Sequence, residues 1–166
     1  MLEMLSYTVP SIVTGVIAFY FFNHFIKNNY QKSNLELLAE KKKVALPIKL
    51  QAYERILLFC ERINPIKMLL RVKPIGENSD EYLQLLLKNI EQEFEHNLVQ
   101  QIYISDNSWT AVIAAKNAII NKLKQTAEKT KSANELRENI LLEYTKTLPP
   151  TDTAIAFLKN EVRKLL

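Results

Sequence analysis

Glycine, cysteine and histidine are all scarce in this chain, and their scarcity excludes several familiar kinds of site. The only glycines are Gly15, inside an apolar run, and Gly76, in a predicted turn. Phosphate-cradling loops and dinucleotide-binding fingerprints need several neighbouring glycines so that the backbone can approach the ligand, and neither pattern is present. Cys60 is the only cysteine, which leaves no intramolecular disulfide and agrees with a reducing compartment. No cofactor and no catalytic residue are predicted.

Charged residues are absent from residues 7–26, which form a nearly continuous apolar run. Twenty residues at helical rise cover about 30 Å, the thickness of the hydrocarbon core of a bilayer. A cleaved secretory signal has a positive start and a small-residue cleavage site, whereas Glu3 precedes this run and phenylalanines fill its end. The pattern predicts a transmembrane helix over residues 7–28, after a short external N-terminus, residues 1–6.

Lysines gather on one side of the apolar run only. None precedes it, and this bias predicts an external N-terminus and a cytoplasmic body. The whole net charge of +4 lies in residues 27–49, so the remaining chain is neutral and lacks the basic face of a nucleic-acid-binding protein. Residues 29–45 are interpreted as a basic juxtamembrane stalk. The lysines expected at the membrane surface are Lys27, Lys32, Lys41, Lys42 and Lys43.

Residues 46–166 are interpreted as one cytoplasmic domain, and the fold class is all-α: a transmembrane helix followed by a bundle of about five helices. No stretch alternates apolar and polar residues well enough to predict a sheet. Pro47 is expected to open a helix that ends at Ile63, because Pro65 interrupts it. A short piece over 66–72 follows. A long helix is predicted from Ser79 or Asp80 to about Ser105, and the next one is predicted to begin at Asp106 or Ser108. Another is predicted to begin at Ser132, where Glu135 completes a capping box. The last one is predicted to begin at Thr151 or Asp152.

Apolar residues at helical spacing predict the buried face of each helix. In the long helix that starts near Ser79, this face includes Leu98 and Ile102. The last helix carries basic residues opposite its apolar stripe, so it packs on the bundle, docks a partner or lies on lipid headgroups. Its register favours packing.

Glu93 and His96 are the sharpest candidate for chemistry. Their i, i+3 spacing on one helix is typical of metal ligands in di-iron helical bundles. Such a centre needs a second motif of the same kind, and the body has no second histidine, so a polar face beside the buried stripe is the favoured interpretation. Cys60 with His96 as its base is a weaker candidate, because a thiol in an apolar stripe is inert. No metal ligand is therefore predicted.

Small residues line one face of the apolar run. Ser11 and Gly15 are four residues apart, as are Thr14 and Ala18. Membrane helices approach closely over such ridges. The ridge favours either self-dimerisation or docking against a larger membrane subunit.

Two segments carry a resemblance to a known family. They are LPIKLQAYERI, residues 46–56, and the stretch over residues 93–103 that begins EFEHNL and ends QIY. Over most of its length the chain resembles an uncharacterised family of short, single-span, membrane-anchored helical proteins of Bacteroidota with no assigned activity. The resemblance implies a bacterial inner-membrane setting and carries over no functional residue.

These observations predict a non-enzymatic single-pass accessory subunit or scaffold in the bacterial inner (cytoplasmic) membrane. Its partners are expected to be the lipid bilayer and other subunits of a larger membrane assembly, and not nucleic acid. A self-associating anchor that acts as a homo-oligomer is the alternative, and a metal-dependent helical-bundle enzyme is the third hypothesis. The residues expected to bind partners are Ser11, Gly15, Ala18, Arg55, Glu91, Glu95, Gln100, Gln101 and Tyr103.

Overall fold

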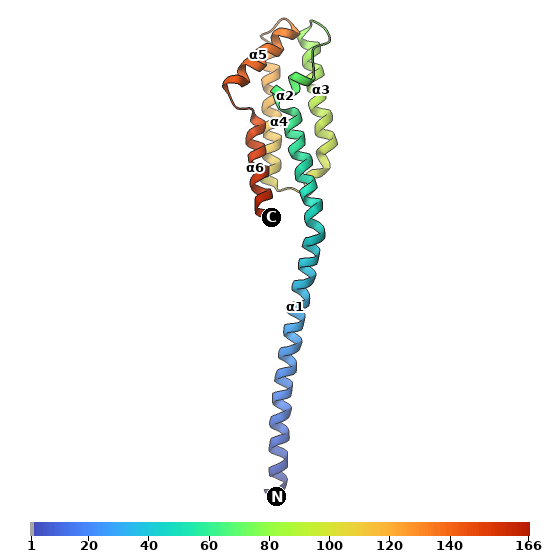
Figure 1. Cartoon of the computed structure of the whole chain (residues 1–166), viewed down its shortest axis with the longest axis vertical. Helices are drawn as coiled ribbons and strands as arrows, with labels where there is room; N and C mark the ends of the chain where they lie inside the picture. Colours follow the sequence, from blue (N-terminus) through green and yellow to red (C-terminus); the bar gives the residue numbers. More distant parts are fainter. Residues whose placement is uncertain (1) are drawn as a thin grey trace. The chain divides into compact units, whose positions relative to one another are not determined.

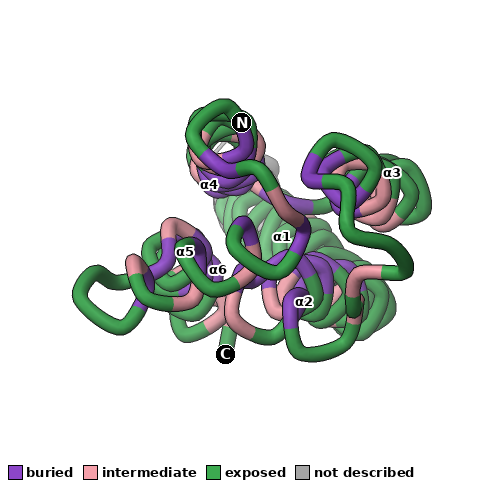
Figure 2. Tube along the Cα trace, turned by 90° about the horizontal axis from the view of Figure 1, so that it is seen from above, coloured by how far each residue is buried: buried purple, intermediate pink, exposed green. Residues whose placement is uncertain are grey.

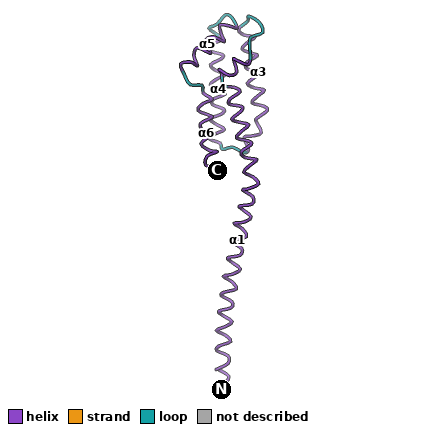
Figure 3. Tube along the Cα trace, in the orientation of Figure 1, coloured by secondary structure: helices purple, strands orange, loops and turns teal. Residues whose placement is uncertain are grey.

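Every regular element in the described part of the chain is helical. The computed structural model describes the backbone of residues 2–166 and the side chains of residues 13–166. The all-α prediction is confirmed (Figures 1 and 3). The elements are α1 (Leu2–Ile63), α2 (Pro65–Arg71), α3 (Ser79–Asn97), the 3₁₀ helix η1 (Leu98–Ile102), α4 (Asp106–Ala127), α5 (Ala133–Lys146) and α6 (Pro150–Leu165).

The chain consists of two units, residues 1–45 and residues 46–166, and α1 contributes to both. The second unit holds the hydrophobic core, to which each α-helix contributes buried apolar residues; Figure 2 colours the buried residues along the trace. Within it α6 packs along α4, and α5 packs against α2 and α3. The predicted packing of the last helix on the bundle is confirmed, because Ala154, Ile155 and Leu158 are buried.

Prolines explain one helix end and fail to explain another. α1 ends at Ile63, as Pro65 predicts, and Asn64 then caps α2 by accepting from the backbone N–H groups of Ile66 and Lys67. The helix start predicted at Pro47 is wrong, since α1 runs through that position. A proline inside a helix removes one backbone hydrogen bond, and the helix continues through Pro47 without it.

α3 is shorter than predicted. It ends at Asn97 and not at Ser105, and the 3₁₀ helix η1 follows. The side-chain Nδ2 of Asn97 donates to the carbonyl oxygen of Glu93 at 2.7 Å, so a side chain competes with the helical ladder at this turn. The tighter winding changes the side-chain period, and Leu98 and Ile102, predicted to be buried, are exposed.

Side-chain caps begin α3, α4 and α5, whereas α6 begins at Pro150, one residue before the predicted Thr151, and Pro149 before it provides no side-chain cap. Asn78 caps α3, one residue before the predicted position, and Ser105 caps α4. At α5 one half of the predicted capping box is present: Ser132 Oγ accepts from the N–H of Glu135, whereas the Glu135 carboxylate accepts from the N–H of Lys131 in place of that of Ser132. These hydrogen bonds satisfy donors that a helix start leaves without a partner.

The predicted transmembrane segment is not supported by the described part of the chain. There, no helix combines the length and the mean hydropathy that a membrane span requires. Residues 7–12 of that segment, and the predicted external residues 1–6, lie outside the residues whose side chains are described. The span therefore stays a prediction.

Candidate functional site

A groove of about 530 Å³ lies between α1 and α3 and brings together several of the residues singled out from the sequence. Arg55 and the exposed Leu58 line it from α1, and His96 lines it from α3. Arg62 Nη1 donates to the two carboxylate oxygens of Glu93 at 2.9 and 3.0 Å. We call this feature the α1–α3 groove; its surface is mixed, with both charges and one exposed leucine.

Glu93 and His96 share the α1–α3 groove, but the Glu93 carboxylate is engaged by Arg62, with Arg71 Nη1 3.9 Å away. Across residues 13–166, no three His, Cys, Asp or Glu side chains are arranged to hold a metal ion. Cys60 lies in the core, where burial, aided by the charge of Glu61, raises the pKa of its thiol to about 12. At neutral pH this thiol is protonated.

Glu91 lies beside a lysine that sequence reasoning missed. Lys116 Nζ of α4 donates to the Glu91 carboxylate at 2.8 Å and lies 3.9 Å from the ring centre of Phe94. Lys116 is buried. It lies four residues after the buried Val112 and three before the buried Ile119, so it shares their face of α4. Glu91 therefore neutralises an internal lysine, and the neighbouring Glu95 is exposed.

The polar residues predicted to bind partners around η1 alternate with apolar ones. Gln101 and Tyr103 are exposed and Gln100 is half-buried. Val99 and Ile102 are more than 60% exposed. The exposed apolar side chains make this segment a better candidate for protein contact than its glutamines alone, because apolar side chains form the cores of protein interfaces.

A half-buried polar link joins α6 to α1 and to the start of α4. Tyr53 Oη donates to the Glu161 carboxylate at 2.8 Å, and Ser105 Oγ donates to its other oxygen. Burial would raise the pKa of Glu161, but the hydrogen bonds from Ser105 and Tyr53 bring it below its ordinary value. Burial and the Glu161 carboxylate raise the pKa of Tyr53 to about 12. Sequence reasoning missed this link, since the partners are 108 and 56 residues apart.

In the first unit, Gly15 and Ala18 are exposed, and Ser11 lies outside the residues whose side chains are described. A Cβ added at Gly15 meets no atom within 4 Å. The five lysines predicted at the membrane surface, between Lys27 and Lys43, are all exposed. The described part of the small-residue ridge is therefore an open helix face.

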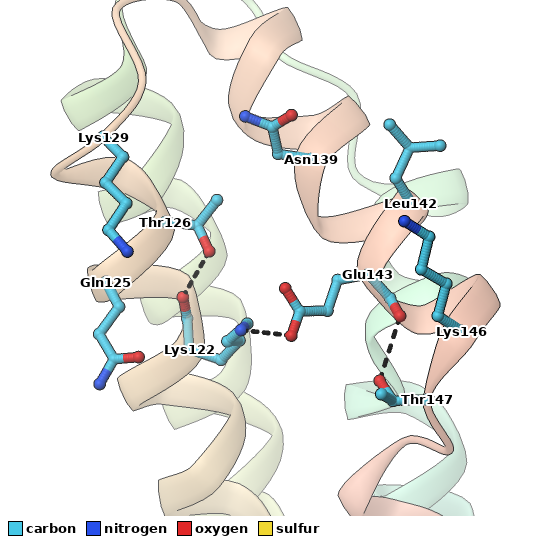
Figure 4. Close-up of a pocket in the computed structure, with 9 residues that line it drawn as sticks. All are labelled: Lys122, Gln125, Thr126, Lys129, Asn139, Leu142, Glu143, Lys146 and Thr147. Atoms are coloured by element: carbon cyan, nitrogen blue, oxygen red, sulfur yellow. Dashed lines mark hydrogen bonds and ion pairs between the residues drawn. The ribbon is translucent and has the colours of Figure 1, made fainter.

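A second polar groove, of about 490 Å³, lies between the C-terminal parts of α4 and α5 (Figure 4). Lys129 comes from the turn that follows α4 and Lys146 from the α5 wall, and Lys122 of α4 forms an ion pair with Glu143 across the groove. Lysines at helix C-termini complement the helix dipole. That stabilising role accounts for these positions without a ligand.

Comparison with known proteins assigns the chain to a family without assigning an activity. No curated protein and no solved structure matches it. A family match covers residues 1–165, which confirms the prediction of an uncharacterised family, while membrane anchoring and an origin in Bacteroidota stay predictions. The chain thus belongs to the family of unknown function DUF7935.

Proposed function

We propose that this protein is a non-enzymatic accessory subunit or scaffold of a larger assembly in the bacterial inner (cytoplasmic) membrane. Residues 7–28 anchor it as a single span, with the N-terminus outside and residues 46–166 in the cytoplasm. Its role is to position a partner: the anchor confines the protein to the membrane, and exposed surfaces of residues 46–166 bind another subunit.

The exposure of large apolar side chains on α1 carries this proposal. Between residues 13 and 25 each of them is more than half exposed, and no charged residue lies among them. In water such exposure forgoes about 25 cal/mol per Å² of apolar surface, whereas lipid tails solvate it fully. The side chains concerned are Val13, Val16, Ile17, Phe19, Tyr20, Phe21, Phe22 and Phe25.

Membrane attachment is tested by alkaline carbonate extraction of the full chain. The wild-type protein should stay with the membrane pellet. Val16→Arg combined with Phe21→Arg should release it, because each arginine costs roughly 2.5–3.5 kcal/mol at the centre of a span. The matched control is Leu35→Arg with Leu38→Arg, which lies on the same helix beyond the predicted span and should not release the protein. A wild-type protein that carbonate extracts completely contradicts the anchor.

The α1–α3 groove and η1 are the surfaces that we propose for partner binding. They combine exposed apolar side chains, Leu58 and Ile102, with charged and polar ones, among them Arg55 and His96. A transient or non-obligate interface has this mixed composition, with apolar anchors inside a polar rim.

Partner binding is tested by purifying the tagged full chain in mild detergent. We expect other membrane subunits to co-purify in stoichiometric amounts, and Leu58→Glu with Ile102→Glu to lose them. Leu70→Glu with Leu142→Glu, on α2 and α5, introduces the same charge at two comparably exposed leucines and should retain them. If no other protein co-purifies with the wild-type chain, the subunit hypothesis is wrong.

A self-associating anchor is the second candidate function. The open helix face around Gly15 supports it, because helices in membranes approach closely where side chains are small. Cysteines introduced at Gly15 or Ala18 should then crosslink two copies in the membrane. The absence of a crosslinked dimer at both positions excludes this ridge as the contact.

A further inference from the structure

An apolar groove of about 360 Å³ lies between α1 and α6, and Glu54 separates it from the α1–α3 groove because this residue lines both. Its buried floor includes Tyr53 and Leu158. Leu50 and Leu57, seven residues apart on α1, and Val162 of α6 are half-buried along its sides. Half-buried apolar side chains at this spacing form a stripe that a further helix pair can cover.

Opposite charges border the groove on its two sides. Glu54 lies on the α1 side, and Lys159 and Arg163 lie on the α6 side. All three are exposed, and among residues 13–166 none of them takes part in an ion pair within the chain. These charges are therefore available to a molecule that covers the groove.

The two helices run antiparallel with a defined register. Tyr53 of α1 bonds to Glu161 of α6, and Asn64, further along α1, bonds to Thr151, at the start of α6. Glu54 directly follows Tyr53, while Lys159 and Arg163 lie two residues on either side of Glu161. The opposite charges thus lie at the same level along the groove.

We propose that a second copy of this chain covers the groove. Residues 46–166 of the two copies then pair about a two-fold axis that runs parallel to α6 and to the part of α1 that lines the groove. This operation places α1 of one copy over α6 of the other. Glu54 of each copy then meets Lys159 and Arg163 of its partner, and the apolar stripes close into a four-helix contact. A two-fold interface requires such a self-complementary patch.

The charge pattern favours a second copy over other occupants. An anionic amphiphile is attracted by Lys159 and Arg163 but repelled by Glu54. A cationic amphiphile is attracted by Glu54 but repelled by Lys159 and Arg163. A second copy satisfies both sides at once with no further component. The pairing does not depend on the subunit role, and its contact differs from that of the self-associating anchor because it lies between α1 and α6 and not at the ridge around Gly15.

Charge reversal and mixing test the pairing on the full chain in mild detergent. The wild-type protein should be dimeric by light scattering. Glu54→Lys alone, and Lys159→Glu with Arg163→Glu alone, should each weaken the dimer at least about tenfold, because the two-fold axis doubles the effect of each substitution. The two variant chains, given different tags and mixed, should co-purify as a heterodimer with all charges matched. Mixing can restore the dimer only if the substituted residues of one copy contact the other copy. A structural defect that acts within a single chain would remain in the mixture.

Three outcomes overturn the pairing. They are a monomeric wild-type protein, a dimer that neither charge reversal weakens, and variants that fail to rescue each other. A wild-type monomer with a bound amphiphile or a bound foreign helix in the groove assigns a different occupant and also overturns it. Carbonate extraction is unaffected by these variants, so failure of the pairing is distinguishable from failure of the membrane anchor.

Discussion

Residues 13–45 and residues 46–166 place similar side chains in opposite environments. In the first region every side chain except Ile26 is exposed, phenylalanines included. In the second, apolar side chains from six helices form one core, and Phe59 is 1% exposed. Both regions are largely helical, so secondary structure does not account for the difference.

The difference lies in how apolar residues are distributed around each helix. In residues 46–166 they recur at three- and four-residue spacing and form stripes, which other helices cover. In residues 13–26 they occupy all sides, so no single packing partner could bury them. Apolar content alone therefore does not predict a core; a stripe and a neighbouring helix are both needed.

Replacing a phenylalanine by alanine in each region tests this comparison most strongly. Phe59→Ala leaves a cavity beside Phe94 and should lower the free energy of unfolding by about 3–5 kcal/mol. Phe21→Ala, where the side chain is 68% exposed, should leave it unchanged. Urea unfolding of the full chain in mild detergent, followed by the fluorescence of Trp109, measures this, because the only tryptophan packs on Phe94. Equal effects of both substitutions contradict the division into two regions.

Two asparagines allow the same comparison with hydrogen bonds. Asn64 caps α2 and its Nδ2 donates to the buried Thr151 Oγ1 at 3.1 Å, so Asn64→Ala should cost about 2 kcal/mol of stability. Asn28 bonds only to the exposed ring of His24, at 3.1 Å, and Asn28→Ala should cost nothing measurable in the same assay. If Asn64→Ala is also neutral, the buried hydrogen bond is not important for stability.

The ionised Glu161 carboxylate makes a smaller contribution to the free energy of unfolding, of about 1 kcal/mol at neutral pH. The pKa of Glu161 lies below its ordinary value of 4.5, because the hydrogen bonds from Ser105 and Tyr53 outweigh the effect of burial. Its contribution to stability is therefore complete above pH 4.5 and is lost as the pH falls through the folded-state pKa. Glu161→Gln should be less stable than the wild type at neutral pH, and the difference should shrink in acid.

The control for that titration is Glu40→Gln, an exposed glutamate of the first region. Its unfolding curve should follow the wild-type curve at every pH. A Glu161→Gln difference that stays constant down to the lowest pH would show that ionisation of this carboxyl does not stabilise the fold.

Gly15→Ala should have the smallest effect. The new methyl group meets no atom within 4 Å, and alanine favours the helix locally by about 1 kcal/mol over glycine. Trp109 fluorescence should report an unchanged unfolding midpoint, since the substitution lies in the region without a core. Circular dichroism of the full chain should report equal or greater helix content. A shift of the midpoint would indicate coupling between the two regions.

Most helices and several of their ends were predictable from short-range chemistry. Pro65 ends α1, and the pair Ser132 and Glu135 begins α5. Both effects are local, because a proline ring or a capping side chain affects backbone groups no more than four residues away. The same local rule failed at Pro47, where α1 continues. Partner-binding residues were only partly predictable: Arg55 lines a groove, but Glu91 serves an internal lysine.

Local chemistry alone thus established an all-helical chain with an apolar N-terminal run, a neutral body and the positions of most helix starts. Packing between distant segments decided the rest: the burial of Lys116, the link from Tyr53 to Glu161 and the apolar groove between α1 and α6. The reason is physical. Caps and propensities act over one helical turn, whereas the burial of a charge or the level at which two helices meet depends on side chains that the sequence separates by 25 to 108 residues.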